Sequence, residues 1–73
     1  MYIFERSVRE MQISQDIKET LIEMYKKEDL ITLKKTLRNL YYNNVFEGMT
    51  NLMFFSYVAG LIDGNIAEGK GKN

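Results

Sequence analysis

The chain of 73 residues has no cysteine, no histidine and no proline, and its first glycine is Gly48. Without cysteine or histidine it cannot form disulfides, use a thiolate or an imidazole in catalysis, or build most transition-metal sites. We therefore expect no metal and no cofactor. The lack of cysteine fits a reducing compartment, and the N-terminal MYIFERSVRE has no basic region followed by an apolar run, so the predicted location is the cytoplasm.

An excess of charge of one sign is also missing. Ten Lys and Arg residues balance ten Asp and Glu residues, which gives a formal net charge of zero. Such a chain is poorly suited to neutralising a nucleic-acid backbone as its main task, and a low net charge permits self-association. A domain of this size buries only about 60% of its unfolded surface. Close packing or a partner subunit must therefore supply the stability that disulfides and metals cannot.

The lack of helix breakers in the first 47 residues favours an all-α fold. Apolar spacing predicts one helix over about 15–27, with Ser14 as its N-cap, and a second over about 30–42, with Asp29 as its N-cap. Links of about two residues between the helices predict antiparallel neighbours. The apolar stripes are Ile17, Leu21, Met24 and Tyr25 on the first helix, and Leu30, Leu33, Leu37, Leu40 and Tyr41 on the second.

A third helix is predicted over about 45–62. Asn44 and Glu47 have the spacing of a capping box at its start, and Gly64 is the expected left-handed cap at its end. Residues 1–12 are expected to form either a short helix over Ser7–Gln12 or an extended arm, and residues 67–73 a disordered tail. The predicted fold is a single domain over 1–66, a small three- to four-helix bundle with a central apolar C-terminal helix.

Two short segments of the chain resemble each other. Leu21–Tyr25 (LIEMY) and Leu37–Tyr41 (LRNLY) are sixteen residues apart, and each is followed by a polar turn and the apolar start of a helix. Two copies are too few to define a repeat family. We interpret the similarity as an aromatic residue placed at each helix corner.

The third predicted helix has two apolar stripes. At 100° per residue, Phe54, Val58 and Leu61 lie opposite a broader apolar face. The two preceding helices can cover only one side, so the N-terminal segment, a second copy or a different protein must cover the other. An exposed stripe of a few hundred Å² usually marks a binding site, and we predict Phe54, Tyr57, Val58 and Leu61 as protein-interface residues. The broader face, assigned to the core, comprises Val45, Met49, Leu52, Phe55, Ser56, Ala59 and Ile62.

Membrane insertion is a weaker interpretation of this helix. The uncharged run Gly48–Ile62 holds fifteen residues, a helix of about 22 Å, whereas a bilayer core is about 30 Å thick. No lysine or arginine flanks it closely. A membrane-associated small protein is therefore the second alternative.

No group of residues indicates catalysis, so we expect that the chain is not an enzyme. Ser7 and Ser14 suit helix caps and Ser56 suits close packing, while GKGK at 69–72 has no strand before it and no helix after it.

One polar cluster lies on the second predicted helix. Lys34, Lys35 and Arg38 project beside Tyr42, and interleaved basic and aromatic groups can bind phosphates and bases. The acidic link Glu28–Asp29 opposes this interpretation. A helix-turn-helix-like nucleic-acid-binding regulator is thus the first alternative. The preferred function is a small non-catalytic interaction or regulatory protein, acting as a homodimer or on a larger protein target through an apolar helix surface.

Overall fold

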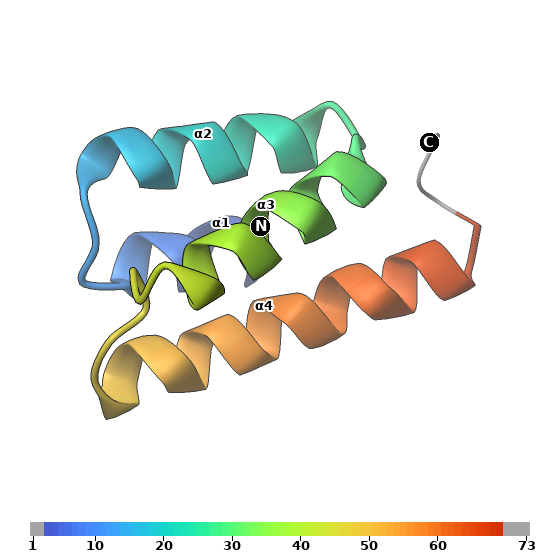
Figure 1. Ribbon diagram of the computed structural model, residues 1–73. Coiled ribbons are helices and arrows are strands. Elements are labelled where there is room, and N and C mark those ends of the chain that lie inside the picture. Colours follow the sequence, from blue (N-terminus) through green and yellow to red (C-terminus); the bar gives the residue numbers. More distant parts are fainter. Residues whose placement is uncertain (1–2, 70–73) are drawn as a thin grey trace.

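The computed structural model describes residues 3–69, so the expectations for residues 1–2 and 70–73 lie outside the described part of the chain. The described residues form four helices: α1 (Ile3–Glu10), α2 (Gln15–Lys26), α3 (Leu30–Tyr42) and α4 (Met49–Ala67). Successive helices run in opposite directions and are joined by short links (Figure 1). The predicted small all-α bundle of antiparallel helices is confirmed.

The helices form a closed ring of contacts. α2 and α4 lie on opposite sides of the bundle, and each packs against both α1 and α3 (Figure 1). Because α4 meets α1 and α3 from one side, none of the helices formed by residues 3–69 covers its other side. The buried core draws on all four helices and on two of the links, and comprises Phe4, Val8, Met11, Leu21, Ile22, Leu30, Leu33, Leu37, Phe46, Val58 and Ile62.

The N-terminal segment folds as a helix that starts earlier than the predicted Ser7–Gln12. Phe4 and Val8 are fully buried, and the Phe4 ring stacks on Tyr25 with centroids 4.2 Å apart. Ser7, expected as an N-cap, instead lies within α1 and is buried. Helix formation is favoured because it places both large side chains on one face.

α2 and α3 begin where the sequence predicts. The Ser14 hydroxyl accepts a hydrogen bond from the Ile17 N–H at 3.3 Å, which satisfies a donor that the helix leaves unpaired. Asp29 occupies the N-cap position of α3.

The similarity of Leu21–Tyr25 to Leu37–Tyr41 has a structural cause, because both segments close their helix with the same motif. After α2, Glu28 adopts a left-handed conformation with φ of 58°. Its N–H donates to the Tyr25 carbonyl at 3.0 Å, and the next N–H donates to the Met24 carbonyl at 3.1 Å. These two bonds satisfy carbonyls at the end of the helix that have no intrahelical partner.

After α3, Asn44 repeats this arrangement and thereby corrects its predicted role. Its φ is 62°, its N–H donates to the Tyr41 carbonyl at 3.1 Å, and the Val45 N–H donates to the Leu40 carbonyl at 3.0 Å. Asn44 therefore ends α3 and does not begin the next helix, and Glu47 lies before α4. Asparagine suits both an N-cap and a left-handed C-terminal position, so the sequence pattern was ambiguous.

α4 begins at Met49, four residues later than predicted, directly after Gly48 with φ of 89°. The non-helical link lets the Phe46 side chain enter the core, where only 3% of its surface stays exposed. Continuing the helix back through Phe46 would forfeit this burial.

A buried amide fixes the first turn of α4 to the α1–α2 link. Oδ1 of Asn51 accepts from the Gln12 N–H at 2.7 Å, while its Nδ2 donates to the carbonyls of Gln12 at 3.2 Å and Glu47 at 3.0 Å. Asn51 is only 6% exposed, so the three bonds are largely shielded from water. Both ends of the amide are satisfied, which is what burial of a polar side chain requires.

α4 also continues past its predicted end, to residue 67, which had been assigned to the tail. Gly64 lies within the helix, and Gly69 takes the left-handed conformation with φ of 79°. Tertiary contacts favour the additional turn: Asn65 Nδ2 donates to the Tyr25 hydroxyl at 3.3 Å, and Ile66 packs partly buried against the core.

Candidate protein-interaction surface

The predicted interface stripe of α4 is covered within the chain. Val58 is completely buried, so it is a core residue and not an exposed interface residue, while Phe54 and Leu61 are half-buried against the core. The side of α4 that meets α3 carries Phe55, Ala59 and Ile62, which line a groove together with α3 residues. The other helix that packs against α4 is α1. Of the four predicted interface residues, only Tyr57 is well exposed, at 47%. The N-terminal segment thus covers this stripe, as one of the three predicted options.

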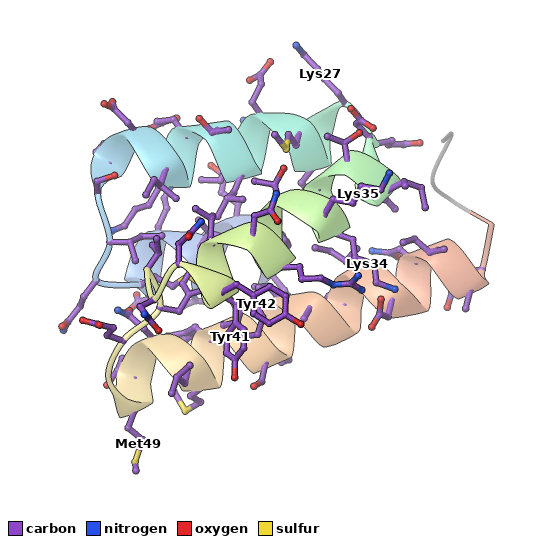
Figure 2. The ribbon with its side chains drawn as sticks, viewed as in Figure 1. Lys27, Lys34, Lys35, Tyr41, Tyr42 and Met49 are labelled. Atoms are coloured by element: carbon purple, nitrogen blue, oxygen red, sulfur yellow. The ribbon has the colours of Figure 1, made fainter. Side chains whose placement is uncertain are left out.

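The exposed apolar residues of α4 lie in another sector. Met49 is 88% exposed, Met53 59% and Leu52 40%. Met49 points away from the bundle at the start of the helix (Figure 2). Met49 and Leu52, assigned to the core from their spacing, are therefore on the surface. We define the outer face of α4 by seven exposed, uncharged residues at three- and four-residue spacing, namely Met49, Leu52, Met53, Ser56, Tyr57, Gly60 and Gly64. Exposed Asp63 lies in the same sector, at the edge toward α3.

The second half of this outer face carries small residues. Ser56, Gly60 and Gly64 are all exposed, which corrects the expected close-packing role of Ser56 within the chain. A Cβ atom added at Gly60 or Gly64 would meet nothing within 4 Å. Nothing in the described fold therefore requires glycine at these two helical positions. The face carries large side chains from Met49 to Tyr57 and is flat at Gly60 and Gly64.

Aromatic rings connect the core to the flank of the outer face. Buried Phe46 packs against Phe55 with ring centroids 4.9 Å apart, and Tyr41 stacks on the other side of this cluster, 5.0 Å from Phe55. Tyr42 meets Tyr41 edge-on at 5.7 Å and is 71% exposed. Both tyrosines come from the end of α3 and lie beside α4 (Figure 2). They extend the apolar surface from α4 onto α3.

Three of the four predicted nucleic-acid contacts line a groove between α3 and α4. The groove has a volume of about 260 Å³, and Lys34, Arg38 and Tyr42 border it. Lys34 Nζ lies 3.0 Å from an oxygen of Asp63, the only charged residue of α4. Lys35 is exposed and points away from α4 (Figure 2). The structure thus keeps all four residues exposed on α3, and an acidic side chain neutralises one of them.

A second hollow, of about 630 Å³, lies between α1, α2 and the C-terminal part of α4. Its walls comprise Glu5, Ile22, Tyr25, Lys26, Glu28, Leu30 and Asn65. Lys26 Nζ lies 3.9 Å from Glu5 Oε1, so two of its three charged side chains face each other. The three charged side chains among its lining residues make it a poorer contact site for an apolar partner than the outer face of α4.

Polar side chains join α1 to α2. Arg9 donates to Glu5 at 3.1 and 3.2 Å and to Glu19 at 3.5 Å. A hydrogen bond from Gln15 at 2.7 Å, reinforced by the Arg9 charge, lowers the pKa of Glu19, and the bond with Glu5 raises the pKa of Arg9 above its ordinary value. These groups are exposed, and such ion pairs stabilise a fold only weakly.

Comparison of the chain with models of protein families, with curated proteins and with solved structures finds no match. Among residues 3–69, no helix combines the length and apolarity needed to cross a membrane. Over the same residues, no three side chains of the metal-ligating types come together. The candidate surface therefore rests on the geometry of this chain alone.

The sequence contains one signal that locates the outer face. Asp63 lies in the same helical sector as Leu52 and Ser56, and a charged residue marks the solvent side of a helix. Asn51, by contrast, lies in the sector that the structure buries, because its partner is the backbone of Gln12, 39 residues away. No local pattern predicts that pairing.

Proposed function

We propose that this chain is a small, non-catalytic interaction or regulatory protein that contacts other proteins through the outer face of α4. The observation that carries the proposal is the exposure of Met49 and Met53, at 88% and 59%, on one face of one helix. Exposed apolar groups gathered on one face mark interaction sites more often than scattered ones do.

The chemistry of the surface supports the proposal. Methionine side chains are flexible and polarisable, so they adapt to varied partner surfaces. Tyrosine is enriched at protein interfaces, and Tyr41, Tyr42 and Tyr57 flank the methionines with about half or more of each side chain exposed. The one charged residue in the sector of the outer face, Asp63, is paired with Lys34 at 3.0 Å and lies outside the methionine cluster, and charge is depleted at the centre of protein interfaces.

Oxidative footprinting tests the proposal without knowledge of the partner. Peroxide oxidises accessible thioethers, and α2, which carries half-buried Met24, lies opposite α4. The oxidation of Met53 is measured relative to Met24, in dilute purified chain and in cells that produce it. We expect the ratio to fall severalfold in cells, because a bound protein shields Met53. An equal ratio in both settings would overturn the proposal.

The second candidate function, nucleic-acid binding, is supported by the exposure of Lys35, Arg38 and Tyr42 on α3. It is the less favoured, because the balanced charge of the chain and the Lys34–Asp63 pair reduce the positive field that phosphate binding requires.

A further inference from the structure

We infer that the partner of the outer face of α4 is a second copy of this chain, bound so that the two α4 helices run antiparallel about a two-fold axis near Ser56. The inference rests on the proposed function and names its partner. Its warrants are the shape, the charge and the area of the outer face.

The outer face is complementary to itself in shape only when the two helices are antiparallel. Met49, Leu52 and Met53 form its bulky N-terminal end, and Gly60 and Gly64 form its flat C-terminal end. The exposed Tyr57 lies next to the proposed axis, at one edge of the face. Antiparallel pairing about Ser56 places the bulky half of each copy over the flat half of the other. Parallel pairing would set bulk against bulk and leave the flat halves apart.

The two glycines support a close helical approach. Each costs helix stability relative to alanine, and neither has a positive φ or a neighbour within 4 Å of an added Cβ. Spaced four apart with Ser56, they form the small-residue series that lets two helices approach closely. A second helix seated on this half supplies a reason for glycine that the single chain lacks.

Charge and area both permit the pairing. The only charged residue of α4, Asp63, is paired with Lys34 at 3.0 Å, so the face does not repel a copy of itself. The exposed parts of Met49, Leu52, Met53, Tyr57, Tyr41 and Tyr42 together equal about three and a half whole side chains. At about 200 Å² for a large side chain, a copy that covered all six residues, including Tyr41 and Tyr42 beside the outer face on α3, would bury about 700 Å² per partner, close to the about 800 Å² of a standard interface.

Cysteine crosslinking in the full chain tests the geometry, because the chain has no cysteine of its own. The variants are S56C, M49C and G64C, with T32C as a control at an exposed position of α3. About the proposed axis the two copies of position 56 face each other, whereas the two copies of position 49 lie about 21 Å apart along the helix. A disulfide needs Cα atoms within about 7 Å.

We expect S56C to form a disulfide-linked dimer under mild oxidation. M49C alone and T32C alone should form no such dimer. An equal mixture of M49C and G64C should form a disulfide between one chain of each variant. Adding G60L to S56C fills the flat half of the face and should abolish the crosslink, while the circular dichroism spectrum of the double variant stays helical. M49C crosslinking to itself as readily as S56C, or no crosslink of S56C at any concentration, would overturn the inference.

The two proposals fail in distinguishable ways. If S56C does not crosslink but Met53 is shielded in cells, the inference of a second copy is wrong, and a different protein occupies the outer face. If S56C does not crosslink and Met53 is equally oxidised in cells and in dilute solution, the proposed function is wrong as well.

Discussion

Replacement of Asn51 tests how α4, and with it the outer face, is held in place. Asn51→Ala removes three hydrogen bonds, of 2.7, 3.0 and 3.2 Å, at a site where the residue is only 6% exposed. A buried hydrogen bond contributes about 1 kcal/mol net, and a partner left unpaired adds about 1–3 kcal/mol. Because water can reach some of the freed backbone groups in the links, we expect a loss of about 2–4 kcal/mol.

This loss is large for so small a chain. At about 0.05–0.15 kcal/mol per residue, the 73 residues have a total stability of about 4–11 kcal/mol. A change of 1 kcal/mol shifts the Tm of a domain of this size by about 4–8 °C, so Asn51→Ala should lower the Tm by about 8–32 °C. Asn51→Asp should cost at least as much, because it keeps the shape but loses both N–H donors and sets a carboxylate beside two carbonyls.

Urea unfolding followed by circular dichroism measures these changes. All variants must be compared at one low protein concentration, because association adds to apparent stability. Asn39→Ala, at an exposed position of α3, is the matched control and should change stability by less than about 0.5 kcal/mol. The reasoning is refuted if Asn51→Ala stays within that range, since the three bonds would then contribute nothing.

Three further predictions concern the ends of the helices and the surface. Glu28→Gly should stabilise the fold by about 0.5–1 kcal/mol in the same unfolding assay, because glycine tolerates the φ of 58° that Glu28 adopts; a loss of stability would contradict this. Gln15→Ala should raise the lowered pKa of Glu19, followed by NMR titration. The stabilisation from Glu19 is present above its unfolded pKa of about 4.3 and is lost as pH falls through the lower folded value. Gln15→Ala should therefore reduce the loss of unfolding free energy over this acidic range. Finally, duplex DNA or RNA should show no salt-dependent binding at low ionic strength; binding that weakens on replacing Lys35 and Arg38 with alanine would favour the nucleic-acid alternative.

The regular parts of the fold were predictable because local signals decide them. The stripes of α2 and α3 have a clear helical period, and Ser14 is an N-cap by both sequence and geometry. The ends of α4 were not predictable, because Asn44 suits two roles and because burial of Phe46 and Ile66 fixes where the helix starts and stops. The start and the end of α4 therefore depend on tertiary contacts that a local sequence pattern does not contain.

The predicted stripe of Phe54, Val58 and Leu61 lies in a sector of α4 that packs against the core, and the exposed apolar residues lie in another sector. An almost uncharged helix has weak amphipathicity, so the sequence shows two apolar stripes without saying which one its neighbours cover. The buried sector is centred near Asn51, Val58 and Ile62, between the two stripes, because α1 and α3 flank it on either side. Tyr57 was the one predicted interface residue that stays well exposed.

Pairing of two α4 helices would also supply stability that so short a chain otherwise lacks. Chains of this length usually need a disulfide, a metal or a partner subunit, and the first of these is impossible without cysteine. Association would bury the exposed methionines and would raise stability with concentration.

Sedimentation of the unmodified chain beside two variants tests the central claim most directly. Met53→Glu places a charge on the outer face, and Thr32→Glu places the same charge on an exposed position of α3. We predict that the wild type and Thr32→Glu sediment with twice the chain mass as concentration rises, and that Met53→Glu stays folded with the mass of a single chain. A wild-type chain that remains a monomer throughout, or a Met53→Glu variant that still doubles its mass, would contradict the account.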